Sequence, residues 1–315
     1  MSTSQPQTRS AATLVLPTIA TLAVVVAYPV FQAVRLSLYG QDINFNVFYR
    51  GFGNYADFLT GPHSEQFWRA VTNTSVFTFI SVILETVIGL GMALAMHHVI
   101  RGRGLLRASI LVPWAIPTAM SALVWKWMFT PHGIVNAVLG TDIIWATEPW
   151  AAKTAIIVAD VWKSAPFMGL LILAGLQTIP NEMYEAARVD GATAWQRFTR
   201  ITLPMIHGAL LVAVLMRMLD ALRVFDLPYL FAGSADNQDL VTLSMLGYKY
   251  AIQQGDSGAG SAVSLLTLVF IGVIAYLFIR LLGADALGTR EAKEARQQAK
   301  KAARASQHHP VQEPS

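Results

Sequence analysis

Charged and polar side chains lie inside two long apolar stretches of this sequence. An ionised group is costly within a lipid bilayer, so such residues mark either a solute pathway or an internal ion pair. Within each stretch they are three or four residues apart, which places them on one helical face. The two groups are Asp160, Lys163, Ser164 and Phe167, and Arg217, Asp220 and Arg223. Charged groups can hydrogen-bond the polar groups of a solute, and an aromatic face can pack against its apolar surface.

Both groups are expected near the middle of the membrane. The two apolar stretches are joined by a polar insert over residues 178–204. At roughly 1.5 Å per helical residue, Lys163 and Phe167 lie about 15 to 22 Å from the end of their stretch next to this insert. Arg217 and Asp220 lie about 20 to 24 Å from theirs. The two groups should therefore meet.

The charged residues also allow a purely structural interpretation. Arg217, Asp220 and Arg223 can form an ion cluster that holds helices together without touching a solute. Glu85, in an earlier apolar stretch, is expected to be a buried hydrogen-bonding residue rather than a ligand contact.

The elements that must position these residues are membrane helices. Hydrophobic residues make up 54% of the 315 residues and charged residues only 13%, far less charge than a soluble domain carries. A helix needs roughly 20 apolar residues to cross the hydrocarbon core. Runs of about this length fall at 12–38, 71–96, 108–130, 153–177, 205–231 and 260–283. We predict an all-α membrane protein with one six-helix domain over residues 11–283.

Basic residues predict the orientation of this domain, because cytoplasmic loops carry the excess of Lys and Arg. One side would carry Arg9, Arg101, Arg103, Arg107, Arg188, Arg197, Arg200, Arg280 and Arg290. The opposite side would carry Arg50, Arg69 and Lys249. Both termini, residues 1–10 and the basic tail 284–315, are therefore predicted to be cytoplasmic. The net charge of +4 reflects this topology and does not indicate nucleic-acid binding.

A polar helical insert over residues 178–204 separates the two stretches that carry the charged groups. Glu185 to Val189 can form a short helix, and Asp190 with Gly191 offers a turn before a second one. Pro204 suits the first turn of the next membrane helix. The cytoplasmic position and the small Ala186 and Ala187 side chains predict a surface that a partner can approach closely.

The insert resembles the EAA loop, E-A-A-x3-G-x9-I-x-L-P, of the membrane permeases of ATP-binding-cassette importers. Its fixed positions are Glu185, Ala186, Ala187, Gly191, Ile201, Leu203 and Pro204. Gly51–Tyr55, Trp125–Phe129 and Gly133–Asn136 resemble further segments of the carbohydrate branch of this family. The stretch Ala232–Asn237 departs from its T-G-G-G-P loop, which leaves the substrate open.

The resemblance implies a type I importer permease in a bacterial or archaeal inner membrane. It implies a second homologous permease, two ATPase subunits docked at the EAA loops, and an extracytoplasmic solute-binding protein. ATP and Mg²⁺ would be bound by the ATPases, since this chain has no G-x-x-x-x-G-K-[ST] segment. The sugar site would be lined by Ser164, Phe167, Arg217, Asp220 and Ala221, with Lys163 beside them.

The resemblance leaves the solute open. A disaccharide such as trehalose or maltose is the first expectation, and glycerol phosphate or its diesters are the alternative. A secondary transporter driven by an ion gradient is the alternative function. No catalytic residue is predicted. No metal site is predicted either, because His97–His98 has no third ligand nearby in the sequence.

Overall fold

The computed structural model describes residues 15–41, 46–98, 102–146, 148–233 and 239–282. This part of the chain is almost wholly helical; its strands, β1 (Tyr39–Gln41) and β2 (Val47–Tyr49), pair antiparallel. The predicted all-α class is confirmed. The N-terminus 1–10, with Arg9, and the tail 284–315, with Arg290, lie outside the described residues, as do Arg101 and residues 234–238.

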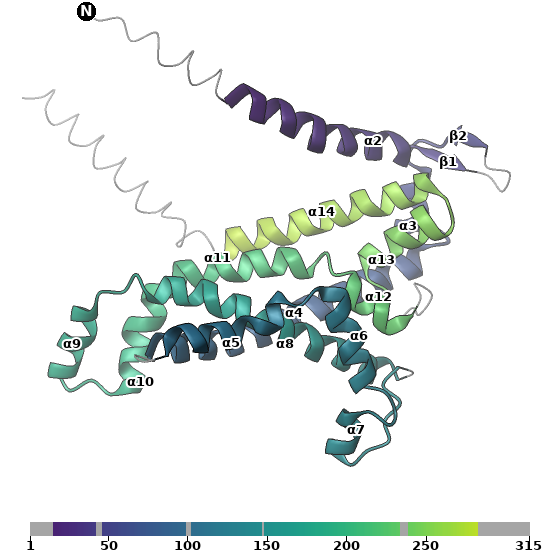
Figure 1. Ribbon diagram of the computed structural model, residues 1–315. Helices are drawn as coiled ribbons and strands as arrows, with labels where there is room; N and C mark the ends of the chain where they lie inside the picture. The colour runs from purple at the N-terminus through teal and green to yellow at the C-terminus, as the bar shows by residue number, and fades with distance from the viewer. Residues whose placement is uncertain (1–14, 42–45, 99–101, 147, 234–238, 283–315) are drawn as a thin grey trace, which may run out of the picture. The chain divides into compact units, whose positions relative to one another are not determined.

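The helices follow one another along the colour gradient of Figure 1. They are η1 (Ala23–Ala27), α2 (Tyr28–Ser37), α3 (Gly53–Leu59), α4 (Ser64–His98), α5 (Arg103–Ala115), α6 (Thr118–Met128), α7 (Ile134–Leu139), α8 (Pro149–Leu176), α9 (Asn181–Val189), α10 (Ala194–Arg197), η2 (Phe198–Thr202), α11 (Leu203–Ala221), α12 (Asp226–Ala232), α13 (Leu243–Tyr248), η3 (Lys249–Gln253) and α14 (Ser257–Leu282).

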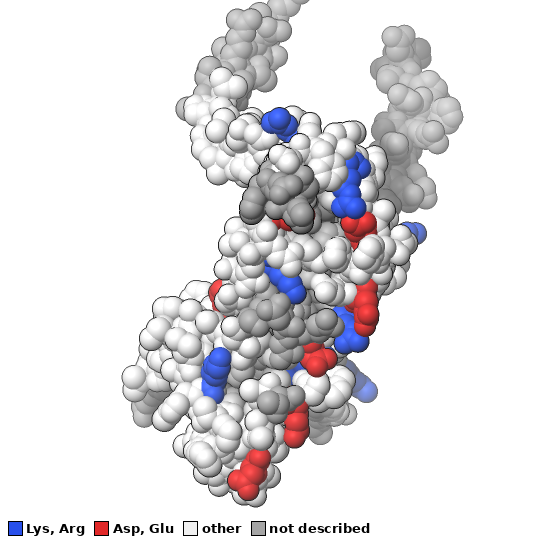
Figure 2. All heavy atoms as spheres, turned by 90° about the vertical axis from the view of Figure 1, so that its right-hand side faces the viewer, with Lys and Arg blue, Asp and Glu red and all other residues white. Residues whose placement is uncertain are grey.

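Within the described residues, five helical stretches are long and apolar enough to cross a membrane. They are Val15–Ser37, Ser64–His98, Pro149–Leu176, Ala194–Ala232 and Ser257–Leu281. Large apolar side chains point outward from them: Ile83, Val87 and Val269 are 62%, 66% and 62% exposed. These outward apolar side chains suit lipid rather than water. The face shown in Figure 2, which is the right-hand side of Figure 1, carries Lys, Arg, Asp and Glu side chains scattered among uncharged ones.

The predicted span at 108–130 is present, but it is not one straight helix. Gly104–Ala115 and Thr118–Met128 are bent by 85° at a short break, and together they count as a sixth span. Pro117 lacks an N–H and disfavours helical geometry in the residue before it. Ile116 accordingly adopts an extended conformation, with φ −71° and ψ 132°.

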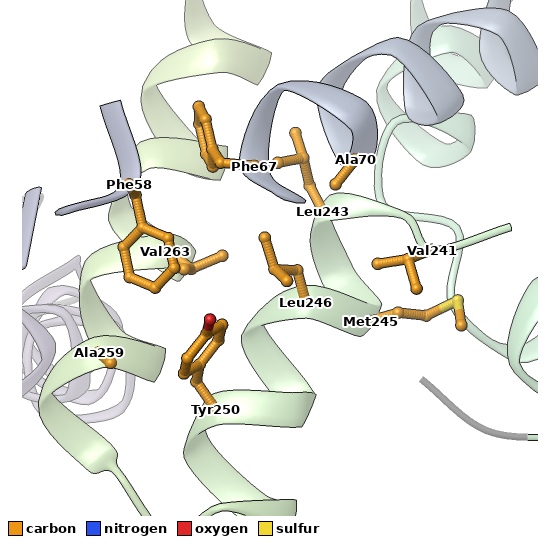
Figure 3. Close-up of a cluster of buried hydrophobic side chains, with 10 residues drawn as sticks. All are labelled: Phe58, Phe67, Ala70, Val241, Leu243, Met245, Leu246, Tyr250, Ala259 and Val263. Carbon is orange, nitrogen blue, oxygen red and sulfur yellow. The ribbon is translucent and has the colours of Figure 1, made fainter. Parts of the chain in front are cut away.

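The chain divides into two compact units, which we describe separately. The first comprises residues 1–76, 146–152 and 223–270, and the second comprises 77–145, 153–222 and 271–315. The first unit has an apolar core drawn from α3, α4, α13, η3 and α14, shown in Figure 3. Its buried members are Phe58, Phe67, Ala70, Val241, Leu243, Met245, Leu246, Tyr250, Ala259 and Val263.

Two asparagines of the family-like segments organise loops. In the first unit, Asn54 is buried and its side-chain amide donates to the backbone oxygens of Ser37 and Tyr39, at 2.9 and 2.7 Å. In the second, the amide of Asn136 donates to Ile143 O at 2.8 Å, and its oxygen accepts from Trp145 Nε1 at 2.8 Å. These residues therefore tie chain segments together within each unit.

In the second unit, α4 and α8 approach each other at glycines. A Cβ added to Gly89 would lie 2.8 Å from Met168 Cβ and 3.0 Å from the backbone nitrogen of Gly169. A Cβ on Gly169 would lie 3.2 Å from Gly89 O. Small residues permit such backbone contact between membrane helices. This crossing allows polar side chains on α4 and α8 to meet.

We expect Gly89→Ala to destabilise the protein by about 1 to 3 kcal/mol, because the added methyl group overpacks the crossing. Gly91→Ala is the matched control on the same helix, since nothing lies within 4 Å of its added Cβ. It should be neutral or slightly stabilising, because alanine favours helix over glycine. Thermal unfolding in detergent measures both. Equal melting temperatures for the two variants would contradict the close crossing.

Candidate functional site

The predicted EAA segment forms two short helices joined by a tight turn. The N–H of Ala192 donates to Ala187 O at 2.8 Å, and that of Gly191 donates to Arg188 O at 3.1 Å. This pair of bonds is the Schellman arrangement that ends a helix. Gly191 takes a left-handed φ of +76°, which glycine adopts without the steric penalty of other residues. The predicted turn is confirmed.

The second short helix begins with a capping box. Thr193 Oγ1 accepts from the backbone N–H of Gln196, and the Gln196 side chain accepts from the N–H of Thr193. Two donors at the helix start are thereby satisfied. The hydroxyls of Tyr184 and Thr202 lie 2.9 Å apart and join α9 to η2. The segment is thus a braced unit rather than a loose loop.

Most of the residues expected to meet a partner are exposed in the EAA segment, while Ala187 and Ile201 are half-buried. In Figure 1, α9 and α10 lie at one end of the second unit and α7 lies at the other. Val189 and Trp195 are 87% and 71% exposed. A hollow of about 390 Å³ between the two helices is lined partly by Ala187, Asp190, Gly191 and Ile201. Glu185, Ala186, Leu203 and Pro204 are exposed, and Pro204 lies in the first turn of α11.

An ion cluster joins α4, α8 and α11 inside the second unit. The guanidinium of Arg217 donates from Nε and Nη2 to the two carboxylate oxygens of Glu85, at 2.6 and 2.8 Å. Its Nη2 also donates to Asp160 Oδ2 at 2.6 Å. The side chains of Arg217, Glu85 and Asp160 are 4%, 0% and 14% exposed. The predicted meeting of the two charged groups is observed, with Glu85 as an additional partner.

The cluster is open on one side. Arg217 Nη1 reaches Asp220 Oδ2 at 3.4 Å, and the Asp220 side chain is 72% exposed. The hydroxyl of Ser164 lies 3.5 Å from Asp160 Oδ1. A charged group this exposed within a membrane helix requires water or a polar partner. The ion cluster therefore extends from the buried Arg217 to an exposed carboxylate on this face.

The broken span contributes a residue that the sequence analysis did not single out. Trp114, near the end of α5, stacks on Phe167 of α8 with ring centroids 5.5 Å apart and planes 11° apart. Its backbone oxygen accepts from Lys163 Nζ at 3.3 Å. Pro113 and Pro117 on either side of it are the sequence signal that could have located the break.

The candidate pathway residues differ in accessibility. Arg217 and Ala221 are buried, Lys163, Ser164 and Phe167 are half-buried, and Asp220 is exposed. Arg223 lies beyond the C-terminal end of α11. Arg217 is therefore enclosed by the ion cluster, and the candidate residues with exposed surface are Lys163, Ser164, Phe167 and Asp220.

Sequence comparisons identify relatives along most of the chain. Residues 85–286 match the family described as "Binding-protein-dependent transport system inner membrane component". The chain is 38% identical to the trehalose/maltose transport system permease protein MalF of Thermococcus litoralis, covering 85% of this chain and 92% of that protein. It is 39% identical to the trehalose transport system permease protein SugA of Mycobacterium tuberculosis, covering 89% and 91%. It is 34% identical to the sulfoquinovosyl glycerol transport system permease protein SmoG of Agrobacterium fabrum, covering 85% and 89%.

Solved structures share the fold. A chain of a bacterial ABC transporter involved in the import of the acidic polysaccharide alginate matches with a TM-score of 0.74 and 25% identity, over 85% of this chain and 93% of that chain. A chain of the inward-facing MetNI methionine ABC transporter matches with a TM-score of 0.55 and 21% identity, over 71% and 98%.

The fold and these likenesses define the class as a permease subunit of an ATP-binding-cassette importer. The chain belongs to the family of binding-protein-dependent transport system inner membrane components. The resemblance noted from the EAA segment is confirmed.

Replacing Arg217 by methionine should destabilise the protein by about 3 to 5 kcal/mol, because it leaves Glu85 and Asp160 buried without a counter-ion. Asp220→Asn is the control within the same cluster. It should cost no more than about 1 kcal/mol, since that carboxylate is largely exposed. Thermal unfolding in detergent measures both. An Arg217→Met protein that melts with the wild type would contradict a structural role for the cluster.

Proposed function

We propose that this chain imports a neutral disaccharide, such as trehalose or maltose, as part of an ATP-driven complex. The observation that carries the proposal is the alignment of nearly the whole chain with two permeases named for trehalose, at 38% and 39% identity. The chain would pair with a second homologous permease around one pathway. An extracytoplasmic binding protein would deliver the sugar.

The charge of the candidate site favours a neutral solute over an anionic one. Glu85, Asp160 and Asp220 surround Arg217, whose Nε, Nη1 and Nη2 all face carboxylates. Among the described residues of the cluster and its rim, these three carboxyl groups outnumber the two cations, Arg217 and Lys163. An incoming anion would meet a cation that is already neutralised. Glycerol phosphate and its diesters are disfavoured for this reason.

An anionic sugar derivative is the competing substrate class. A relative named for sulfoquinovosyl glycerol is 34% identical, and a structural neighbour at 25% identity belongs to an importer of an acidic polysaccharide. Lys163 is the cation that would serve such a solute, since Arg217 is buried by its carboxylates.

Two partner ATPases would bind ATP and Mg²⁺ and would dock on the EAA segment of each permease. The exposed Val189 and Trp195 side chains offer apolar contact area there, which a protein partner would cover. The segment and both chain termini would then face the cytoplasm, in agreement with the excess of basic residues on that side.

Closure of the ATPases would move α8 and α11 together, because the braced EAA segment connects them directly. Asp160 lies 16 residues before the end of α8 and Arg217 lies 14 residues after the start of α11, about 24 and 21 Å along the helices. A shift at the cytoplasmic end would thus reach the residues around the ion cluster. ATP would favour the outward-facing state through its tighter binding to the closed ATPases.

Uptake by vesicles that contain this chain and its co-purified partners tests the proposal. With labelled trehalose, maltose, sulfoquinovosyl glycerol and glycerol phosphate as the panel, we expect uptake of a neutral disaccharide only when ATP is present. Preference for an anionic solute would refute the substrate class. Uptake driven by a proton or sodium gradient without ATP would refute the importer mechanism.

The coupling role of the EAA segment can be tested with two glycines of similar geometry. Gly191 and Gly102 have φ values of +76° and +77°, and neither has an atom within 4 Å of an added Cβ. Alanine at either position should cost about 1 to 2 kcal/mol of local backbone strain. We expect Gly191→Ala to lower the sugar imported per ATP hydrolysed several-fold, and Gly102→Ala to leave that ratio unchanged. Equal ratios in the two variants would argue against coupling through this turn.

A further inference from the structure

An aromatic pair lies beside the exposed side of the ion cluster in the second unit. Lys163 and Phe167 are four residues apart on α8 and therefore share a helical face. Lys163 contacts the backbone of Trp114, and Phe167 stacks on its ring. Trp114 therefore lies on the face that carries Lys163, beside the ion cluster.

Trp114 lies next to the break between α5 and α6, and this break explains its contact with Lys163. An intact helix would pair the Trp114 carbonyl with the N–H four residues later, but the chain bends by 85° between α5 and α6. The freed carbonyl accepts from Lys163 Nζ at 3.3 Å. A cation at the C-terminal end of a helix is also favoured by the helix dipole. Lys163 thus fixes the end of α5, and with it the tryptophan.

The indole ring retains free surface although it stacks on Phe167. Trp114 is 47% exposed, so the contact with Phe167 leaves much of the residue uncovered. Apolar C–H faces of a sugar ring pack well against an aromatic face, while the sugar hydroxyls need polar partners at its edge. Lys163, which donates to the Trp114 carbonyl, and the exposed Asp220 are polar groups beside the cluster.

A second aromatic pair in the same unit shows the contrasting environment. Trp125 and Trp162 meet edge to face with centroids 5.6 Å apart. Both line a groove of about 570 Å³ whose other walls are almost wholly apolar, including Leu84, Ile88 and Val161. Trp162 is 39% exposed. Trp114 and Trp162 are therefore similar in exposure but differ in their polar surroundings.

We propose that Trp114 is a specificity-determining residue, which forms with Phe167 a two-ring platform for one sugar ring of the transported solute. Lys163 and Asp220 hydrogen-bond the hydroxyls of that ring. This role rests on the proposed import of a neutral sugar. It assigns the broken span a direct part in solute selection, in addition to its part in crossing the membrane.

Uptake by variants provides the first test. In vesicles that contain the complete complex, Trp114→Leu should lower ATP-dependent uptake of trehalose or maltose about tenfold, the equivalent of one lost aromatic stacking contact. Trp114→Phe keeps an aromatic face and should retain most of the uptake. Trp162→Leu is the matched control and should transport as the wild type does. Binding-protein-stimulated ATP hydrolysis should persist in all three, which separates lost solute contact from lost assembly.

Cysteine accessibility provides a second test that does not depend on transport. The chain contains no cysteine, so Trp114→Cys introduces a single thiol. A water-soluble methanethiosulfonate reagent should modify this thiol, and saturating trehalose or maltose should slow the reaction. The thiol of Trp162→Cys should react slowly, and sugar should not change its rate.

The outcomes separate the two proposals. Normal sugar uptake by Trp114→Leu overturns the platform while sugar import stands. A thiol in Trp114→Cys that does not react, or that reacts at a rate sugar does not slow, overturns it in the same way. Equal losses in Trp114→Leu and Trp162→Leu also overturn it, because they indicate a general packing defect. A wild-type complex that carries no neutral sugar overturns the proposed function and the platform together.

Discussion

The buried guanidinium of Arg217 is the constraint on which the second unit depends. A charged side chain at the middle of a membrane helix costs about 2.5 to 3.5 kcal/mol even by insertion scales, so it must be paired inside the bundle. Glu85 and Asp160 pair it from two other helices. Their approach requires close backbone packing, which Gly89 and Gly169 permit. Three helices are thus joined at one point.

Two of these helices, α8 and α11, continue into the EAA segment, so the ion cluster and the EAA segment are connected through the same helices. α9 and α10 join the end of α8 to the start of α11. The capping box at Thr193, the turn at Gly191 and the contact between the Tyr184 and Thr202 hydroxyls hold this connection in a defined conformation. The ion cluster joins the same two helices at a second point, through the contact of Arg217 with Asp160.

Much of the architecture could be predicted from particular residues. Apolar length located the spans, Asp190 and Gly191 marked the turn, and helical spacing with depth brought Asp160 and Arg217 together. The break at Ile116 and Pro117 was not predicted, because a proline within an apolar run can either kink a membrane helix or be absorbed by its neighbours. Glu85 was expected to be buried, but its pairing with Arg217 spans 132 residues and follows no local pattern.

The sequence by itself determined that this protein is a membrane permease with an EAA segment, because hydrophobic length, charge asymmetry and the EAA spacing are local properties of the chain. Only the tertiary structure decided which charged groups are buried in ion pairs and which stay exposed. That distinction depends on burial and on contacts between distant helices, as the buried Arg217, the exposed Asp220 and the stacked Trp114 illustrate. The residue type of a charged side chain in a membrane helix does not tell a structural ion pair from a solute contact. Only the side chains around it in space distinguish the two roles.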